Sequence, residues 1–185
     1  MVQHPTNIAI NPPKVLLLIC LLDGDADDLS DAEATIQTNM LGPIRMTNAL
    51  IDHLVKQPDA AIINVSSGLA FVPLVATPTY SATKAALHSY TVSLREALRT
   101  RVEVIELAPP AVQTDLTPGQ STRPGYLPLK AYIDEVMERF QKQPTPQEIL
   151  VEKVKPLRFA EAERQFDERL NRLNDAARHA RESQG

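Results

Sequence analysis

Two short apolar runs on either side of a long amphipathic segment constrain the fold of this chain most strongly. The run AIINV at residues 61–65 and the run VEVIEL at residues 102–107 both predict short strands. Residues 79–101 between them predict a helix. Their apolar side chains recur at helical spacing and include Ala82, Ala86, Leu87, Tyr90, Leu94 and Leu98. A strand, a long helix and another strand in succession predict a βαβ unit with parallel strands and a right-handed crossover.

A second long helix is predicted before this unit, and its sequence also predicts a kink. Residues 31–56 carry an apolar stripe that is compatible with a period of 3.6 residues. The stripe consists of Ile36, Met40, Ile44, Leu50, Ile51, Leu54 and Val55. Gly42 and Pro43 lie inside the segment. Because proline lacks an amide proton and its ring clashes with the preceding turn, we expect a local kink over residues 39–43.

The other segments complete an α/β pattern. The run VLLLICLL at residues 15–22 predicts a strand, because a membrane-spanning helix needs about 20 apolar residues. Residues 108–128 contain five prolines and two glycines and predict a loop, and long loops in this position are usually lids or binding segments. Helices are predicted at residues 129–141 and 146–154. A terminal amphipathic helix is indicated by Phe159, Ala162, Phe166, Leu170, Leu173 and Ala177.

Composition restricts the partners of such a chain. Its 185 residues fit one domain, or one domain with an appendage, and the net charge of −4 predicts no nucleic-acid partner and no membrane association. Cys20 is the only cysteine, so no intrachain disulfide can form, and we expect a cytoplasmic protein. No metal site is predicted, because the histidines show no ligand spacing. They are His4, His53, His88 and His179.

Three polar side chains predict a shared site near the end of the first strand of the βαβ unit. Tyr80 and Lys84 are four residues apart and would lie on one face of a helix. Ser67 precedes Tyr80 by 13 positions and follows strand 61–65 at its carboxyl end, where open α/β sheets bind ligands. An ammonium close to the phenol would lower its pKa from the usual value near 10. The alternative is an ordinary amphipathic helix with a half-buried Tyr80 and a solvated Lys84.

This set of groups suits hydride transfer between a nicotinamide and a carbonyl or alcohol. The tyrosine would act as general acid or base, and the serine hydroxyl would donate a hydrogen bond to the same substrate oxygen. The cofactor would supply the hydride.

Four short motifs resemble those of the classical short-chain dehydrogenase/reductase family. Asn39 in TNMLGP, Ser67 in NVSSG, and Tyr80 and Lys84 in YSATK match the family pattern of Asn, Ser, Tyr and Lys. The segment APPAVQT, with Pro109, Val112 and Thr114, resembles the family segment that touches the nicotinamide carboxamide. The resemblance covers about residues 29–114. It implies an NAD- or NADP-dependent oxidoreductase that acts on a small-molecule carbonyl or secondary alcohol.

The resemblance also implies a role for each matched residue. Tyr80 would be the catalytic acid/base, and both Tyr80 and Lys84 would also bind the cofactor, Lys84 through the nicotinamide ribose. Ser67 would position the substrate, and Asn39 would hold a water that leads to Lys84. For Asn39, an ordinary polar residue at a proline kink is the alternative.

The implied fold is a Rossmann-like, doubly wound parallel sheet, truncated at the amino end and extended by C-terminal helices. We expect this domain to span residues 1–157, with a substrate loop and helices at 114–157 and a C-terminal amphipathic helix at 158–185. The family commonly packs the helices predicted here at 31–56 and 79–101 between subunits, so the resemblance implies a homodimer or homotetramer.

The chain departs from the family pattern on the nucleotide side. The family's G-x-x-x-G-x-G turn, which receives the pyrophosphate, and its N-N-A-G turn are absent from this sequence, and Pro110 stands where glycine is common. Two hypotheses follow. The chain is an NAD(P)-dependent oxidoreductase, or it is a truncated, catalytically inactive relative that serves as an interaction or dimerisation module.

Overall fold

A four-stranded parallel sheet forms the centre of the molecule. The structure, a computed structural model, describes residues 15–18 and 29–182. The strands are β1 (Val15–Leu18), β2 (Ala61–Val65), β3 (Glu103–Leu107) and β6 (Glu148–Ile149), in the order β1-β2-β3-β6. All three neighbouring pairs are parallel. The predicted α/β class with a Rossmann-like parallel sheet is therefore confirmed.

The predicted βαβ unit is present with nearly the expected bounds. β2 is followed by α3 (Pro78–Leu98) and then by β3, whose Val104 pairs with Ile62 of β2. The predicted strand at residues 15–22 is confirmed over β1, and its remaining four residues lie outside the described part of the chain. Because β1, β2 and β3 run parallel, their carboxyl ends meet at one edge of the sheet.

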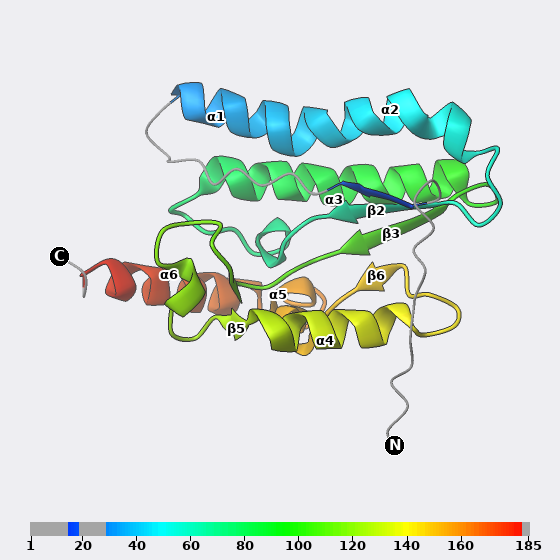
Figure 1. Ribbon diagram of the computed structural model, residues 1–185. Helices are drawn as coiled ribbons and strands as arrows, with labels where there is room; N and C mark the ends of the chain where they lie inside the picture. Colours follow the sequence, from blue (N-terminus) through cyan, green and yellow to red (C-terminus); the bar gives the residue numbers. More distant parts are fainter. Residues whose placement is uncertain (1–14, 19–28, 183–185) are drawn as a thin grey trace, which may run out of the picture.

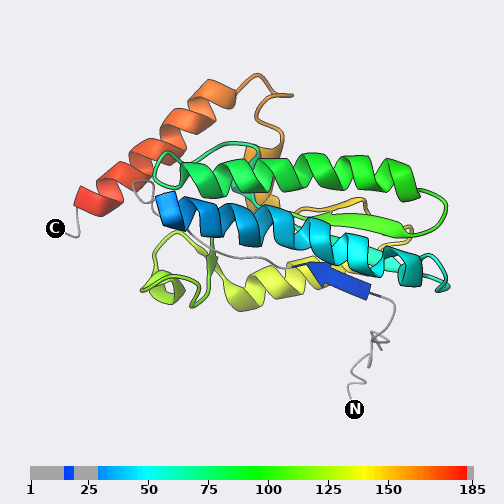
Figure 2. The ribbon, with the colours of Figure 1, turned by 90° about the horizontal axis from the view of Figure 1, so that it is seen from above.

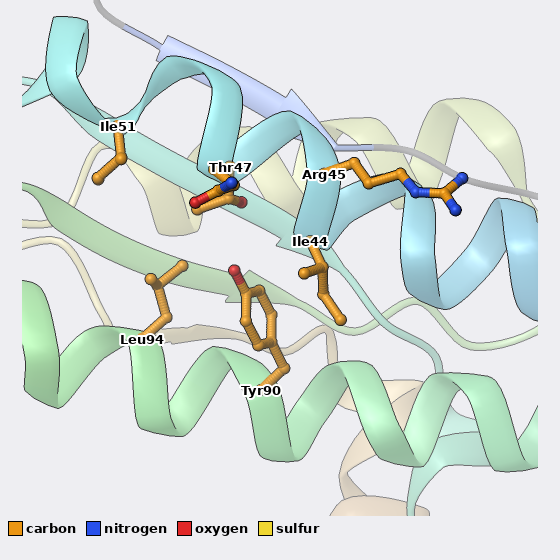
Figure 3. Close-up of a pocket in the computed structure, with 7 residues that line it drawn as sticks. Ile44, Arg45, Thr47, Ile51, Tyr90 and Leu94 are labelled. Carbon is orange, nitrogen blue, oxygen red and sulfur yellow. The ribbon is translucent and has the colours of Figure 1, made fainter.

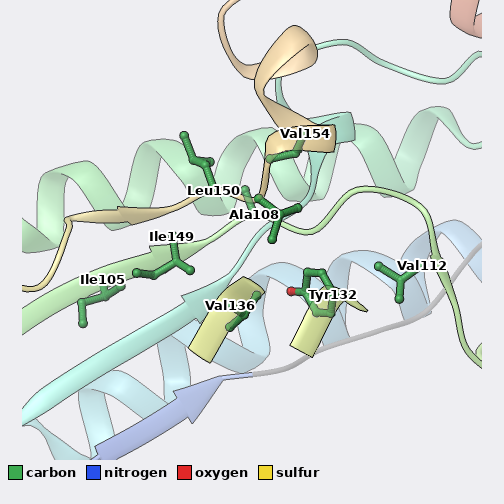
Figure 4. Packing of buried hydrophobic residues seen from close by; sticks show 9 residues of the cluster. Ile105, Ala108, Val112, Tyr132, Val136, Ile149, Leu150 and Val154 are labelled. Atoms are coloured by element: carbon green, nitrogen blue, oxygen red, sulfur yellow. The ribbon is translucent and has the colours of Figure 1, made fainter. Parts of the chain in front are cut away.

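Helices cover both faces of the sheet (Figures 1 and 2). On one face, α2 (Gly42–Leu54) and α3 pack against β2 and β3 around a core of Leu54, Ala60, Ile62, Leu98, Val102 and Val104. On the other face, α4 (Leu129–Phe140) covers the core drawn in Figure 4. That core contains Ile105, Ala108, Val112, Tyr132, Val136, Ile149, Leu150, Val151 and Val154. Ile62 and Val104 belong to the first core and Ile105 to the second, as the alternation of side chains along a strand requires.

A π-helical turn interrupts the first long helix where the sequence predicted a kink. The helix consists of α1 (Leu29–Ile36), the turn η1 (Gln37–Leu41) and α2. The amide of Gly42 donates to the carbonyl of Gln37, five residues earlier. Pro43 has no amide proton to donate to the carbonyl of Asn39, which explains why the α-helical hydrogen-bond register changes at this point.

The proline-rich loop after β3 contains a small sheet of its own. β4 (Val112–Gln113) pairs in parallel with β5 (Leu127–Pro128), and the short 3-10 turn η3 (Gln120–Thr122) lies between them. The expected loop at residues 108–128 thus contains β4, η3 and β5 and leads directly into α4.

The prediction of a helix at residues 146–154 was wrong. This segment forms strand β6 and the 3-10 turn η4 (Glu152–Val154), and α5 (Lys155–Arg158) follows it directly. The amide of Glu106 donates to the carbonyl of Gln147, which places the segment at the open edge of β3. Ile149 of β6 is fully buried and pairs with Leu107 of β3, so pairing in the tertiary fold gives this segment its strand conformation.

The terminal helix α6 (Phe166–Glu182) begins seven residues later than Phe159, the first residue of the predicted apolar stripe. Arg164 has a φ of 57°, a left-handed conformation that separates α6 from the preceding turn. The predicted division of the chain at residue 158 stays a prediction. Among the residues described, no helix is both long and apolar enough to cross a membrane.

Candidate active site

The candidate site lies at the carboxyl end of β2, where the carbonyl of its last residue, Val65, faces Lys84 of α3. Ser66 and Ser67 follow Val65 directly and are both buried, and the amide of Ser66 donates to the carbonyl of Leu107 in β3. The amide of Gly68 donates to the carbonyl of Pro109 at 2.8 Å. The ends of β2 and β3 are therefore joined at the edge of the sheet where the sequence placed the site.

Ser67 caps the 3-10 turn η2 (Gly68–Ala70). Its backbone is extended, and its Oγ accepts a hydrogen bond from the amide of Leu69 at 3.1 Å. A hydroxyl has one proton and two lone pairs, so this bond uses an acceptor position and leaves the proton for donation. Ser67 is 9% exposed and Ser66 1%, so Ser67 is the more accessible of the two hydroxyls.

Lys84 is fully buried, which is unusual for a lysine and shows that it is held by polar groups. Its Nζ donates to the carbonyl of Val65 at 3.0 Å and lies 5.5 Å from the centroid of the Tyr80 ring. Tyr80 itself is half-buried. The alternative of a solvated Lys84 on an ordinary amphipathic helix is excluded, because the ammonium lies inside the protein between α3 and the end of β2.

Asn39 lies in the π-helical turn η1 and is fully buried. Both η1 and η2 pack against α3, so the structure brings the elements that carry Asn39, Ser67, Tyr80 and Lys84 together at one end of the molecule. π-Helical turns occur frequently at functional sites. The position of the buried Asn39 in such a turn is therefore consistent with a functional role.

Pro109, Val112 and Thr114 were expected to touch the nicotinamide. Gln120 of η3 donates through Nε2 to the carbonyl of Val112 at 2.9 Å and to the hydroxyl of Thr114 at 2.8 Å. Its Oε1 accepts from the hydroxyl of Thr117. The two acceptors thus bind a primary carboxamide from the chain itself. The Val112 side chain packs in the core under α4, so only its backbone faces this loop (Figure 4).

One polar cluster next to the site was not predicted. His88 follows Lys84 by one helical turn, and its Nδ1 lies 2.7 Å from Oε2 of the fully buried Glu106 on β3. The hydrogen bond to Glu106 raises the pKa of His88, although burial lowers it in part. An acidic residue within the apolar run VEVIEL was the available signal, because a buried carboxylate nearly always has a partner.

Glu148 and Arg158 complete this cluster. Arg158 binds the carboxylate of Glu148 at 3.0 Å and lies 4.8 Å from the centroid of the Phe71 ring, which in turn contacts the ring of His88 edge-on. Donor atoms of His88, Glu106 and Glu148 lie within 4.8 Å of one another, a spacing that could hold a metal ion. The Arg158 guanidinium already pairs with Glu148, and the His88 ring already pairs with Glu106.

A shallow hollow of about 280 Å³ separates α2 from α3 away from this site (Figure 3). Its walls are mostly apolar and come from both helices, with Ile44, Thr47 and Ile51 on α2 and Tyr90 and Leu94 on α3. The groups proposed for chemistry do not line it.

Comparisons with known proteins agree with this geometry. Residues 23–125 match the family model described as short chain dehydrogenase. The uncharacterized oxidoreductase DltE of Bacillus subtilis strain 168 is 38% identical over 162 residues, which are 85% of this chain and 64% of the relative. The chain thus spans less than two thirds of that relative's length.

Solved structures show the same fold. A short chain dehydrogenase from Burkholderia cenocepacia J2315 in complex with NADP is 26% identical, has a TM-score of 0.70, and is matched over 85% of this chain and 68% of its own. A short-chain dehydrogenase from Sphingobium yanoikuyae in complex with NADPH has a TM-score of 0.68 at 19% identity, over 82% of this chain and 63% of its own. The family match covers more than half of the residues, and this chain belongs to the short-chain dehydrogenase/reductase family.

Proposed function

We propose that this protein is an NAD(P)-dependent oxidoreductase that interconverts a carbonyl and a secondary alcohol, with Tyr80 as the general acid/base. The observation that carries the proposal is the fully buried Lys84 ammonium beside the Tyr80 ring, at the carboxyl end of a parallel sheet. A buried cation next to a phenol favours the phenolate and so facilitates proton transfer near neutral pH.

The chain's own residues would divide the proton chemistry among them. In the reducing direction, Tyr80 gives its phenolic proton to the substrate oxygen, and the Ser67 hydroxyl donates a hydrogen bond to the same oxygen. Lys84 stabilises the phenolate that remains. Asn39, buried behind α3, orders the polar groups through which the proton is replaced.

A nicotinamide cofactor supplies the hydride when it is bound. Residues on the nicotinamide side fit such a group, because the carbonyl of Val112 and the hydroxyl of Thr114 already accept from a carboxamide of the same chemical type. Ser66 Oγ, buried at the end of β2 with no hydrogen-bond partner among the described residues, is a further polar atom there. The glycine-rich turn of the family is not part of this sequence. The similar Burkholderia structure contains NADP, so NADPH is tested beside NADH.

Cofactor binding tests the proposal directly. The purified 185-residue chain is titrated with NADH and with NADPH while nicotinamide fluorescence is followed. We expect saturation with at least one of them below about 1 mM, the upper end of ordinary Michaelis constants. Absence of binding to both would contradict the oxidoreductase proposal and favour the second hypothesis, an inactive interaction module.

Replacing the proposed acid/base separates chemistry from folding. Tyr80→Phe should lower turnover by about 100-fold or more, because it removes the transferred proton, while cofactor affinity stays nearly unchanged. Tyr90→Phe is the matched control, since Tyr90 is a half-buried tyrosine of the same helix that lines the hollow between α2 and α3. Equal losses in both variants would indicate a structural effect.

Self-association through α2 and α3 is part of the same proposal. Met46 on α2 and Val92 on α3 are each 46% exposed, so apolar side chains face outward from both helices. We expect a homodimer or homotetramer in light scattering after size-exclusion chromatography. The double variant Met46→Glu/Val92→Glu should then elute as a monomer.

A further inference from the structure

Asn174 is the single buried residue among residues 166–179 of the terminal helix α6, at 5% exposure. This helix follows the segment matched to the family model, and it lies at the end of the molecule toward which β2 and β3 point (Figure 1). A buried amide on a helix whose other described side chains are half-buried or exposed is informative, because burying a polar side chain is unfavourable unless its hydrogen bonds are formed.

The Asn174 side chain makes three hydrogen bonds, two of them to a loop about 100 residues earlier in the chain. Oδ1 accepts from the amide of Val75 at 2.7 Å, and Nδ2 donates to the carbonyl of Pro73 at 3.2 Å. Nδ2 also donates to the carbonyl of Leu170, one turn back on α6. Both amide protons and one oxygen lone pair are used, which fixes the side chain in one orientation.

The loop that Asn174 holds connects two groups proposed for catalysis. Ser67 precedes it and Tyr80 follows it. On the side of α3, Ser81 Oγ accepts from the amide of Leu74 and donates to the carbonyl of Thr77. Ser81 and Asn174 therefore bind neighbouring backbone groups of the loop from two different helices.

We propose that α6 is a clamp on the catalytic loop, and that Asn174 is a positioning residue that fixes residues 72–77 and thereby the place of Tyr80 relative to Ser67. The effect on catalysis rests on the function proposed above, whereas the clamp itself does not. Asparagine suits the position because it alone combines a donor and an acceptor on a side chain of this length. Aspartate keeps the acceptor for Val75 but turns a negative charge toward the carbonyls of Pro73 and Leu170.

Hydrogen exchange tests the clamp without any need for activity. In Asn174→Ala, exchange of the Val75 amide should accelerate by about tenfold, since one hydrogen bond is lost, while exchange of Ile63 and Ile105 in the sheet stays as in the unchanged protein. Asn171→Ala, an exposed asparagine one turn earlier on α6, is the matched control and should leave the Val75 amide unaffected. An unchanged Val75 amide in Asn174→Ala, or equal acceleration throughout the sheet, would overturn the clamp.

Kinetics then separate a positioning role from a purely structural one. Asn174→Ala should lower kcat for carbonyl reduction by about two- to tenfold, with KM for the cofactor unchanged. The loop leads into the start of α3, where the proposed proton donor Tyr80 lies, and itself carries no residue expected to bind the cofactor. Asn174→Asp should lower it at least as much. A kcat equal to that of Asn171→Ala would overturn the positioning role. Absence of turnover in the unchanged chain would contradict the proposed function, while the exchange result would still decide the clamp.

Discussion

The βαβ unit of residues 61–107 and the C-terminal region of residues 148–182 use polar side chains in different ways. In the βαβ unit, Lys84 and Ser67 face the end of β2, and both belong to the group proposed for proton transfer. In the C-terminal region, Arg158 and Asn174 reach back to the βαβ unit and its loop, and neither is proposed to touch a substrate. The comparison suggests that one region carries the chemistry and the other holds it in place.

The largest expected effect breaks the chemistry and leaves the fold intact. Lys84→Met keeps the length and volume of the side chain but removes its charge, so turnover should fall by about 100-fold or more. Stability should fall by no more than about 1–3 kcal/mol, because the buried carbonyl of Val65 loses its donor. Steady-state kinetics and urea denaturation measure the two effects.

The control for this variant is Lys142→Met, which replaces an exposed lysine at the end of α4. It should leave both activity and stability near those of the unchanged chain. A large loss of stability in Lys84→Met with a proportionate loss of activity would show that Lys84 is mainly structural, and the contrast between the two regions would then fail.

The next effect tests whether the end of β2 packs tightly against the C-terminal region. In Gly68→Ala the added methyl would lie 2.9 Å from Cδ1 of Leu157 and 3.0 Å from Cγ2 of the fully buried Val154. We expect a loss of about 1–3 kcal/mol in the free energy of unfolding, because both contacts are shorter than van der Waals distance. Urea denaturation measures it.

A double variant shows whether the clash with α5 is the cause. Leu157→Ala removes the nearest atom, so Gly68→Ala should cost less in that background than in the unchanged chain. Additive losses would mean that the methyl is tolerated by other means, and that residues 68 and 157 are not coupled.

The sequence predicted the βαβ unit well because its information is local. The runs 61–65 and 102–107 and the apolar spacing of α3 each lie within one element, and Pro43 is itself the cause of the kink that places Asn39. Tyr80 and Lys84 are one helical turn apart, so their proximity follows from helix geometry alone.

The C-terminal region was predicted poorly because its information is long-range. β6 has only two residues, and its strand character comes from pairing with β3, which no local pattern reveals. Asn174 lies 99 residues from its partner Val75. The pair of His88 and Glu106 within the βαβ unit, 18 residues apart, was missed for the same reason. Such partners are fixed by the tertiary fold, so their residue types alone do not indicate them.

A smaller effect depends on pH and tests the pair of His88 and Glu106 in the βαβ unit, beside which Glu148 and Arg158 of the C-terminal region lie. The hydrogen bond to Glu106 raises the pKa of His88 above its usual 6.5. The folded protein then binds this proton more tightly than the unfolded chain does. The stability from the pair is therefore fully present below about pH 6.5 and is lost as pH rises through the raised pKa. We expect a loss of about 1 kcal/mol between pH 6 and 9 in urea denaturation.

His88→Gln should remove this pH dependence, because glutamine keeps a hydrogen-bond donor without a titratable proton. His53→Gln, at an exposed histidine of α2, should leave the profile as it is in the unchanged chain. An identical profile in His88→Gln would assign the pH dependence to other groups, and the ionic link among His88, Glu106, Glu148 and Arg158 would lose its support.

The smallest expected effect concerns the loop between the two regions. Gln120 binds the carbonyl of Val112 and the hydroxyl of Thr114, the acceptors expected to meet the nicotinamide carboxamide. Gln120→Ala frees both, so fluorescence titration should show cofactor binding that is tighter by about two- to fivefold, the equivalent of one weak hydrogen bond. Gln113→Ala is the matched control, because Gln113 binds the carbonyl of Arg123 in the same loop and leaves those two acceptors occupied. Weaker binding in Gln120→Ala would mean that Gln120 supports the cofactor site, and equal changes in both variants would mean that loop order alone sets the affinity.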